Sequence, residues 1–327
     1  MMDRRVKNGN KMKAVIIDAG TIRVKDIPKP KPSANEALIK VCKAGICNTD
    51  LEIAKGYMQF EGTLGHEFVG EVEYAADQSW IGKKVVGEIN IYCGLCDYCR
   101  LGMTKHCSQR DVLGILSKEG AFAEYLTLPL QNCHPVPASL SDSEAVFAEP
   151  VAAALEIFER VNIGKEAKTL ILGDGKLGLL VAHIMRQHTV NVTCVGKHSR
   201  NLDTLKRVGI ETHLSGIDLD RQFSVIVEAT GNEKGLEEAL RLVCPRGIIV
   251  LKSTYRGKAQ IDVSQIVVDE VQLLGSRCGP FPKAIRQIEQ RMINVIDLID
   301  GDFPLERSDE AFALAREPGT LKILLTP

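Results

Sequence analysis

The chain has 327 residues, a length that suggests about two domains. Its 41 basic and 42 acidic residues nearly balance, which argues against nucleic acid or an anionic membrane as a partner. No apolar run approaches the ~18 residues of a transmembrane helix, and the polar start MMDRRVKNGNK lacks the apolar core of a secretory signal. We therefore expect a cytoplasmic protein in a reducing compartment, where disulfides are rare.

The first part of the chain is predicted to be rich in β-strands. A mobile tail is expected at residues 1–11. Short valine- and isoleucine-bearing runs follow it, separated by Gly, Pro and Asn, which is typical of strands. These runs are KAVIID, EALIKVCKAGIC, FVGEVEYA, GKKVVGEI and AFAEYLTL.

The pattern changes near residue 142. The stretch SDSEAVFAEPVAAALEIFERV predicts a helix with a Ser/Asp start signal. Strands and helices then alternate, which predicts a parallel sheet covered on both faces. The expected strands are TLILG, NVTCVG, SVIVEATG, GIIVLK and VQLLGSR, and the expected helices are KLGLLVAHIMRQH, RNLDTLKRVG and GLEEALRLVC; a helix KAIRQIEQRMI and a strand LKILLTP close the chain.

Four cysteines gather in the stretch CGLCDYCRLGMTKHC: Cys93, Cys96, Cys99 and Cys107. Closely spaced cysteine pairs in an intracellular chain favour zinc over disulfides. Four thiolates from one loop close a tetrahedral site that has no open position, so the zinc would be structural. A lobe of unmetallated thiols is the alternative.

A glycine-rich turn joins an apolar strand to an apolar helix in LILGDGKLGLL. In this context the pattern G-x-G-x-x-G predicts a dinucleotide site, because glycines allow the tight turn, the approach of a pyrophosphate and close helix–strand packing. The helix N-terminus then faces the phosphates. The residues concerned are Gly173, Gly175, Lys176, Leu177 and Gly178.

The end of the second strand of this half bears on the choice of dinucleotide. Folds that prefer NAD usually end this strand in an acid that holds the ribose 2′-hydroxyl. Here the strand ends in Gly196, followed by the cations Lys197, His198 and Arg200. Such cations suit a 2′-phosphate, so the sequence favours NADP(H) over NAD(H); a solvated helix start is the alternative.

Three further short stretches carry zinc-ligand chemistry. AGICNTD contains Cys47 and Thr49, TLGHEFVGEV contains His66 and Glu67, and FAEPVAAAL contains Glu149. Thiolate, imidazole and carboxylate are all good zinc ligands. Taken singly, each residue is also compatible with an ordinary core or helix-start position.

Together these motifs resemble the zinc-dependent medium-chain dehydrogenase/reductase superfamily, in its alcohol dehydrogenase-like group. GHE followed by V-G-x-V, the four-cysteine lobe and the later G-x-G-x-x-G occur in the order and spacing of that family. The resemblance implies a catalytic GroES-like domain at residues 12–150 and 282–327, with the zinc lobe at about 92–108. It also implies a Rossmann dinucleotide domain at residues 151–281.

The resemblance also assigns roles to individual residues. Cys47, His66 and Glu149 match the positions that hold the catalytic zinc, and Glu67 matches a glutamate beside the metal. Thr49 matches the hydroxyl that bonds the substrate oxygen and starts the proton relay, although the histidine that often continues the relay is missing. Two zincs per chain are expected, and the family's dimers or tetramers suggest a homo-oligomer.

Residues at two further strand ends are candidates for the nicotinamide half, since ligands of open α/β sheets lie at the carboxyl ends of the strands. Ordinary turn chemistry is the alternative for each. Thr230 and Gly231 follow one strand, and Ser276, Arg277 and Cys278 follow another.

The leading hypothesis is a zinc-dependent oxidoreductase that transfers a hydride between NADP(H) and a small alcohol or polyol, or the matching aldehyde or ketone. The zinc would polarise the substrate oxygen and the cofactor would carry the hydride. Three alternatives remain open: a conjugate alkene reductase of the same fold, a non-catalytic NADP-binding scaffold or sensor, and a zinc ribbon for nucleic acid, which the balanced charge disfavours.

Overall fold

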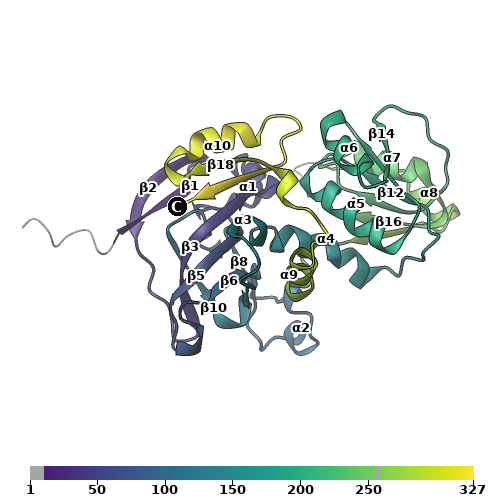
Figure 1. The fold of residues 1–327 in the computed structure, drawn as a ribbon. Coiled ribbons are helices and arrows are strands. Elements are labelled where there is room, and N and C mark those ends of the chain that lie inside the picture. The colour runs from purple at the N-terminus through teal and green to yellow at the C-terminus, as the bar shows by residue number, and fades with distance from the viewer. Residues whose placement is uncertain (1–10, 255–257) are drawn as a thin grey trace, which may run out of the picture. The chain divides into compact units, whose positions relative to one another are not determined.

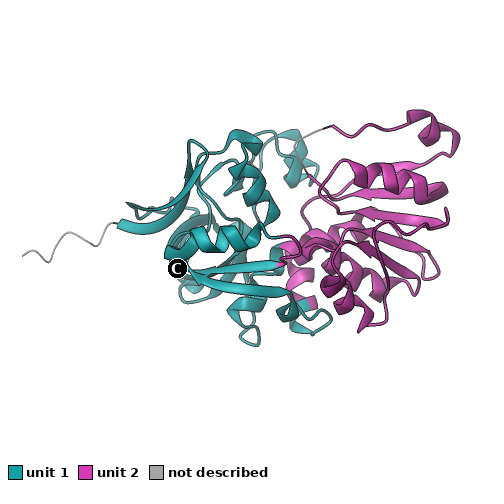
Figure 2. Ribbon diagram, turned by 90° about the horizontal axis from the view of Figure 1, so that it is seen from above, with its two compact units in different colours: residues 1–149, 288–317, 322–327 teal, residues 150–287, 318–321 magenta. Residues whose placement is uncertain are grey.

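The structure of the chain, a computed structural model, describes residues 11–254 and 258–327. Contacts within the chain divide it into two compact units (Figure 2). The domain boundaries expected from the sequence, at residues 150 and 281, stay predictions. Unit 1 runs to Glu149 and adds Ile288–Glu317 and Lys322–Pro327, whereas unit 2 comprises Pro150–Gln287 and Pro318–Leu321.

The tail expected at residues 1–11 lies outside the described residues, except for Lys11. That residue begins the first strand, β1, which is two residues longer at its start than the run KAVIID. Among the described residues, no helix combines the length and the apolar character needed to cross a bilayer. The cytoplasmic location expected from the sequence stays a prediction.

Unit 1 is built mainly from β-strands (Figure 1). Its largest sheet has the order β11-β6-β5-β3-β19-β18, with β10 paired to β3, and two smaller sheets have the orders β2-β1-β4 and β7-β8-β9. The strands are β1 (Lys11–Asp18), β2 (Thr21–Pro28), β3 (Glu36–Ile46), β4 (Gly62–Thr63), β5 (Glu67–Tyr74), β6 (Lys84–Gly87), β7 (Asn90–Ile91), β8 (Asp111–Leu113), β9 (Ser117–Lys118), β10 (Tyr125–Pro129), β11 (Cys133–Pro135), β18 (Ile299–Pro304) and β19 (Lys322–Thr326).

Short helices link these strands. The α-helices of this part are α1 (Asn48–Ala54), α2 (Asp97–Arg100), α3 (Asp142–Ala145) and α10 (Ser308–Ala315). The 3-10 turns are η1 (Tyr57–Gln59), η2 (Gln78–Trp80), η3 (Thr104–His106), η4 (Leu130–Asn132), η5 (Ile296–Leu298) and η6 (Leu305–Arg307).

The pairing of three strands brings distant parts of unit 1 together. β3 pairs antiparallel with β5, which places Gly45 opposite Glu67. On its other side β3 pairs antiparallel with the closing strand β19, which places Ile46 opposite Ile323. The residue after β3, the residue before β5 and the start of β19 therefore meet at one end of this sheet.

Unit 2 contains a six-stranded parallel sheet of order β14-β13-β12-β15-β16-β17 (Figure 1). The order reverses direction on either side of β12, which is the topology of doubly wound dinucleotide-binding sheets. The central strands are buried along their length, as expected for a sheet covered on both faces. The strands are β12 (Thr169–Leu172), β13 (Val192–Gly196), β14 (Glu211–Leu214), β15 (Phe223–Glu228), β16 (Val243–Leu251) and β17 (Gln272–Gly275).

The helices of unit 2 pack on this sheet: α5 contacts β12 and β13, α6 contacts β13 and β14, and α7 contacts β15 and β16. Their apolar faces meet the strands in a core that includes Leu170, Ile226 and Leu240. The helices wholly within unit 2 are α5 (Lys176–His188), α6 (Ser199–Lys206), α7 (Lys234–Leu242) and α8 (Val263–Val268). α4 (Ala148–Arg160) and α9 (Phe281–Glu289) lie mostly in this unit, and their residues 148–149 and 288–289 belong to unit 1.

Several features differ from the sequence prediction, which also did not expect β2, β18 and α10. The helix expected over SDSEAVFAEPVAAALEIFERV is two helices, α3 and α4, separated at Val146 and Phe147. Ser141 does cap the first of them, because its hydroxyl accepts the N–H of Glu144. The edge strand β14 was not predicted, since its sequence ETHL is polar and only half-buried and therefore lacks an apolar strand signal.

Candidate active site and metal centres

The four cysteines of the lobe lie together in unit 1. Their Sγ atoms are all within 4.8 Å of one another. Sγ of Cys96 is 3.5 Å from that of Cys99, and Sγ of Cys107 is 3.5 Å from that of Cys93. The short helix α2 and the turn η3 lie between the cysteines, so a loop with little sheet structure brings the thiols together.

Backbone donors of the same loop point at these sulfurs. The N–H groups of Leu95 and Cys96 each lie 3.4 Å from Sγ of Cys93. Backbone hydrogen bonds from Cys99 and Ser108 lower the pKa of Cys96 to about 6. Desolvation and the hydrogen bond to Cys96 raise the pKa of Cys99 to about 12. The backbone donors that lower the pKa of Cys93 and Cys96 favour thiolates at these two positions, and thiolate sulfur is a preferred ligand of zinc.

The lobe therefore fits the structural zinc expected from the sequence. Four sulfur ligands complete a tetrahedral coordination shell and leave no position for a substrate. No imidazole or carboxylate belongs to this group of four among the described residues. Zinc in this lobe stays a prediction, and its chemistry would be structural.

A second group of potential ligands lies at the end of the large sheet of unit 1. Sγ of Cys47 and the ligand atoms of His66 and Glu67 all lie within 4.8 Å of one another. Cys47 follows β3 and caps α1, whereas His66 and Glu67 stand at the start of β5. His66 is 3% exposed and Glu67 is 1% exposed, and Cys47 is half-buried, whereas three of the four lobe cysteines are half-buried.

Asp50 organises this group from the first turn of α1. Its Oδ2 accepts the backbone N–H of Cys47 at 2.8 Å, and its Oδ1 lies 3.3 Å from Nδ1 of His66. Burial lowers the pKa of His66, but the charge of Asp50 and hydrogen bonds to Asp50 and Cys47 outweigh it and raise that pKa well above its usual value. The sequence analysis did not single out Asp50.

Glu67 has a buried counter-ion at the start of β19. Nζ of Lys322 donates to Oε2 of Glu67, and the lysine is 0% exposed. The opposite residue, Gly45, leaves room for this pair, because a Cβ there would lie 2.6 Å from Oε2 of Glu67. Within the described part of the chain, Oε1 of Glu67 is buried without a hydrogen-bond partner, which is the environment that a bound metal would complete.

Of the other two residues predicted for this site, Thr49 borders the ligand group and Glu149 is not part of it. The hydroxyl of Thr49 lies 3.7 Å from Sγ of Cys47, so it borders the group. Glu149 lies in the first turn of α4 and is not part of the group of ligand atoms found among the described residues. Its place as third zinc ligand stays a prediction.

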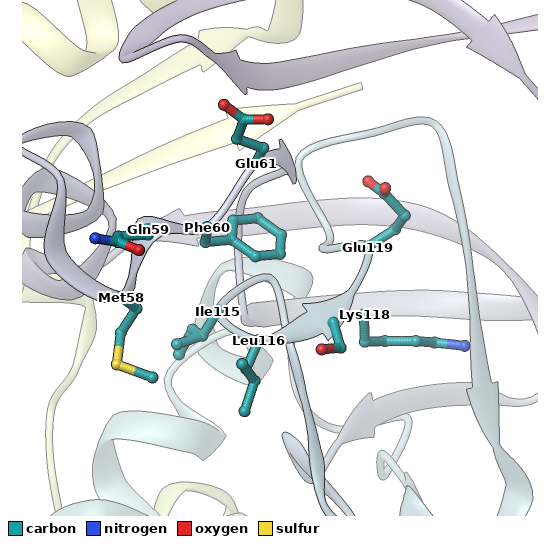
Figure 3. Close-up of a pocket in the computed structure, with 9 residues that line it drawn as sticks. Met58, Gln59, Phe60, Glu61, Ile115, Leu116, Lys118 and Glu119 are labelled. Carbon is teal, nitrogen blue, oxygen red and sulfur yellow. The ribbon is translucent and has the colours of Figure 1, made fainter.

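A hollow of about 260 Å³ lies in the same unit (Figure 3). One wall is the segment that precedes His66 by a few residues, Met58–Glu61, and the other is the segment at residues 115–119. Met58, Gln59 and Ser117 adopt left-handed backbone conformations, with φ of 61°, 51° and 58°. The walls of the hollow therefore include backbone conformations that residues other than glycine rarely adopt.

The glycine-rich loop of unit 2 has the geometry expected for a dinucleotide cradle. Gly173 has φ of +114°, and a Cβ there would lie 2.5 Å from the carbonyl oxygen of Ala229. A Cβ at Gly178 would lie 2.0 Å from the carbonyl oxygen of Gly173. No atom lies within 4 Å of the Cβ position of Gly175, so the backbone is open to a ligand at the start of α5. These residues fit a pyrophosphate.

The other two residues of the motif border this cradle. Nζ of Lys176 lies 3.4 Å from the carbonyl oxygen of Leu321, which belongs to the same unit. Leu177 is half-buried in the first turn of α5. The lysine therefore contacts the returning chain at residues 318–321.

The next strand along the chain, β13, ends beside a carboxylate that belongs to the glycine-rich loop. Asp174 is 5% exposed, and its Oδ2 accepts the N–H groups of Lys197 at 3.0 Å and His198 at 2.6 Å. Nδ1 of His198 lies 3.1 Å from the same oxygen. Lys197 and Arg200 are exposed. Sequence reasoning treated Asp174 only as a variable position of the motif.

The predicted residues after β15 are held by a buried carboxylate that the sequence prediction missed. The hydroxyl of Thr230 donates to Oε1 of Glu228 at 2.6 Å, and Ser253 donates to the same atom at 2.9 Å. The N–H of Gly231 donates to Oγ of Ser253 at 2.8 Å. These bonds fix the turn at the end of β15, and a role in cofactor binding stays a prediction.

The predicted residues after β17 surround a buried lysine. Nζ of Lys252 donates to the carbonyl oxygen of Arg277 at 2.9 Å and lies 3.2 Å from Oγ of Ser276. Cys278 is 6% exposed. The turn is thus ordered by Lys252, which the sequence analysis did not single out, and its contact with a cofactor stays a prediction.

Two family models match the chain. The alcohol dehydrogenase GroES-like domain matches residues 33–138, and the glucose dehydrogenase C-terminus matches residues 144–325. The second match alone covers more than half of the chain. The two matches meet between residues 138 and 144, close to the point where the sequence pattern changes.

Curated relatives are similar over nearly the whole chain. A sorbitol dehydrogenase of Halalkalibacterium halodurans is 26% identical over 94% of this chain and 96% of its own length. An L-threonine 3-dehydrogenase of Coxiella burnetii is 29% identical over 91% of this chain and 94% of its own length.

Solved structures share the fold. A Sinorhizobium meliloti protein bound to NADP superimposes with a TM-score of 0.89 at 27% identity, covering 97% of this chain and 99% of its own. An Escherichia coli protein in complex with NADH gives a TM-score of 0.89 at 24% identity, covering 98% and 100%. The predicted fold class, a Rossmann-type parallel sheet with a GroES-like β-rich domain, is confirmed.

Proposed function

The chain belongs to the zinc-dependent medium-chain dehydrogenase/reductase superfamily, in its alcohol dehydrogenase-like group, and on this basis we propose a zinc-dependent hydride transfer as its reaction. One substrate is a nicotinamide dinucleotide. The other is a small alcohol or polyol, or the matching aldehyde or ketone. The observation that supports the proposal best is the group of half-buried Cys47 with buried His66 and Glu67, whose ligand atoms lie within 4.8 Å of one another.

Cys47 and His66 would hold the catalytic zinc, with Glu149 as the third ligand and Glu67 beside it. Bound there, the zinc supplies Lewis-acid polarisation of the substrate oxygen. Asp50 would orient His66, since it faces Nδ1 and leaves the other ring nitrogen for the metal. Thr49 lies beside Cys47 and would accept or return the proton of the substrate hydroxyl.

Glu67 has a role that follows from its pairing. Lys322 neutralises one carboxylate oxygen, while Oε1 is without a partner among the described residues. A carboxylate held in this way presents one oxygen next to the ligand group without an uncompensated charge in the core. We propose that Glu67 approaches the metal through Oε1.

Relatives support the substrate class. The curated proteins of similar sequence include dehydrogenases of sorbitol, L-threonine and erythritol or L-threitol, all of which carry a secondary or primary hydroxyl. We propose such a hydroxyl compound as the class of substrate for this chain. Structures of the same fold bind either nicotinamide cofactor, NADP in the Sinorhizobium meliloti protein and NADH in the Escherichia coli protein. The NADP(H) preference predicted from Lys197, His198 and Arg200 therefore stays a prediction.

The homo-oligomer expected from the resemblance has a candidate surface in unit 2. β17 lies at the edge of the parallel sheet. The neighbouring helix α8 exposes Val263, Val267 and Val268 at 62%, 70% and 79%. An exposed edge strand beside apolar side chains favours pairing with a second copy. Light scattering should give a dimer or tetramer mass, and Val267→Lys with Val268→Lys should lower it.

The proposed reaction is tested by two measurements on protein purified without added metal or chelator. Elemental analysis should give two zincs per chain. A panel of small alcohols and polyols with NAD⁺ and NADP⁺, and of matching carbonyls with the reduced cofactors, should show a change in nicotinamide absorbance. A chain that holds zinc at both sites but turns over no member of the panel would contradict the proposed reaction class.

A further inference from the structure

The carboxyl end of β13 determines which dinucleotide an α/β sheet of this topology accepts. An acid that ends this strand bonds the ribose 2′-hydroxyl of NAD, and cations there accommodate the 2′-phosphate of NADP. The strand ends here in Gly196, so an acid is missing from the usual place in the sequence. The structure, however, puts a carboxylate there from another element.

That carboxylate belongs to Asp174, the residue between the first two glycines of the motif. A Cβ at Gly196 would lie 2.3 Å from both Cβ and Cγ of Asp174. An aspartate or glutamate at position 196 would therefore clash with the side chain of Asp174. The strand ends in glycine because the side chain of Asp174, from the neighbouring loop, occupies the space that a side chain at position 196 would need.

The position of Asp174 is fixed from both sides. Its backbone carbonyl accepts Nδ2 of Asn201 at 3.0 Å, and the same amide group lies 3.2 Å from the carbonyl oxygen of Gly319. Its Oδ2 accepts the N–H groups of Lys197 and His198. Asn201 is 1% exposed, so this arrangement is buried. Because both its backbone and its carboxylate are hydrogen-bonded, the Asp174 side chain has little freedom to move away from the end of β13.

We infer that Asp174 is the residue that selects the dinucleotide, and that the site takes NAD(H) in preference to NADP(H). The inference rests on the proposed function, since it presumes a nicotinamide dinucleotide, and it reverses the preference predicted from the sequence. Oδ2 has three close donors, whereas among residues 11–254 and 258–327 the contact found for Oδ1 is the 3.3 Å approach of Nδ1 of His198. A carboxylate oxygen offers two acceptor positions, so Oδ1 retains capacity for a ribose hydroxyl.

A 2′-phosphate meets three obstacles at the same place. The backbone N–H groups of Lys197 and His198, which would otherwise bind an anion at the start of α6, already bind Asp174. One nitrogen of the His198 ring faces the same carboxylate. The carboxylate itself repels a second anion held close to it. Of the three cations expected to bind the phosphate, His198 is therefore committed to Asp174.

The test is a comparison of dissociation constants for NADH and NADPH, measured by calorimetry on the full-length zinc-loaded protein without substrate. The unmodified chain should bind NADH at least about 10-fold tighter than NADPH, because a hydrogen bond to a charged group is worth about one to two orders of magnitude in affinity. Asp174→Ser removes the charge and frees the backbone donors. It should shift the NADPH-to-NADH ratio by about 10- to 100-fold in favour of NADPH.

A matched control separates Asp174 from the general charge of the helix that follows β13. Lys206→Gln removes an exposed charge from that helix, α6, outside the predicted cofactor residues, and should change the ratio by less than about 3-fold. Asp174→Asn keeps the shape of the side chain and should move the ratio in the same direction as the serine variant. This variant preserves the test if the serine variant does not fold.

The outcomes that contradict the inference are distinct from those that contradict the proposed function. Tighter binding of NADPH than of NADH by the unmodified chain would overturn the inference and restore the preference predicted from the sequence. An unchanged ratio in both Asp174 variants would overturn it as well. Failure of the unmodified chain to bind either dinucleotide would overturn the proposed function itself.

Discussion

The ligands of the cysteine lobe come from one loop, Cys93–Cys107, whereas the Cys47 group takes its members from different strands of a sheet. The lobe thiols are stabilised by backbone N–H groups of the same loop, such as that of Cys96 toward Cys93. In the Cys47 group His66 and Glu67 are buried, and the group depends on charged partners at residues 50 and 322. The first arrangement is local, and the second exists only in the folded sheet.

This difference explains why the ligands of the two sites need different stabilising partners. Partly exposed thiolates are stabilised by water and by nearby backbone donors. A carboxylate that is 1% exposed, such as Glu67, needs a counter-ion because the interior does not solvate its charge. Removal of a lobe residue should therefore have local consequences. Removal of a residue around the Cys47 group should affect chemistry or the stability of the whole unit.

The largest expected effect is that of Cys47→Ser on turnover. Loss of this thiolate should lower kcat by at least about 10³-fold, since the metal supplies several kcal/mol of transition-state stabilisation. The dissociation constant of the dinucleotide should stay nearly the same. Cys42→Ser is the matched control, because Cys42 lies in β3 outside both ligand groups and its loss should leave kcat within about 2-fold. Equal activity of the two variants would contradict the metal mechanism.

The next effect in size is that of Lys322→Met on stability. The substitution leaves the buried carboxylate of Glu67 without its counter-ion, which typically costs about 3–5 kcal/mol. Urea unfolding followed by circular dichroism should show this loss. Lys13→Met removes a lysine from an exposed pair with Glu306 and should leave the urea midpoint unchanged. A midpoint for Lys322→Met equal to that of Lys13→Met would contradict the account of the buried pair.

The buried pair also shows how far the sequence carries the prediction. The lobe was predictable because its four cysteines are close in sequence and share one chemistry. Glu67 and Lys322 are separated by 255 positions, and the closing strand LKILLTP carries no motif around its lysine. Their pairing follows from the antiparallel register of β3 with both β5 and β19. Such a register depends on the whole sheet, and a single sequence does not contain it in local form.

The dinucleotide half illustrates a different limit. The turn and helix after β12 were predicted correctly, because the glycine pattern is a local requirement of the backbone. The prediction of cofactor preference looked for an acid at the end of β13 and found Gly196. The close approach of Asp174 to that glycine is a property of two neighbouring loops in space. The strand order β13-β12 creates it, and the sequence gives no direct signal for it.

A smaller effect is expected for Asp50→Asn, which tests orientation of the ligands by a buried partner. The change keeps an oxygen near the N–H of Cys47 but removes the charge that faces His66. Zinc affinity and kcat should fall by about 10- to 100-fold, the usual cost of losing a partner behind a metal ligand. Competition with a chelator measures the affinity, and added zinc should partly restore kcat.

Asp97→Asn in the lobe is the matched control for this change. Asp97 is likewise an acid close in sequence to a predicted ligand, Cys96, but its side chain is 94% exposed. Its loss should leave the zinc content and kcat unchanged. If Asp50→Asn and Asp97→Asn lowered kcat equally, a buried partner such as Asp50 would matter no more to the zinc ligands than an exposed neighbour, and the contrast between the two sites would be wrong.

The smallest effect on chemistry is expected for Cys99→Ser, although it removes a ligand outright. Zinc content should fall from two per chain to one, because three sulfurs no longer close the tetrahedral site. The thermal midpoint should fall, since a structural zinc stabilises the fold of its own loop. kcat and KM at low temperature should stay within about 2-fold of the unmodified chain, because the lobe has no position for a substrate. A loss of kcat as large as that of Cys47→Ser would show that the lobe is not separate from the chemistry, and the division drawn between the two sites would fail.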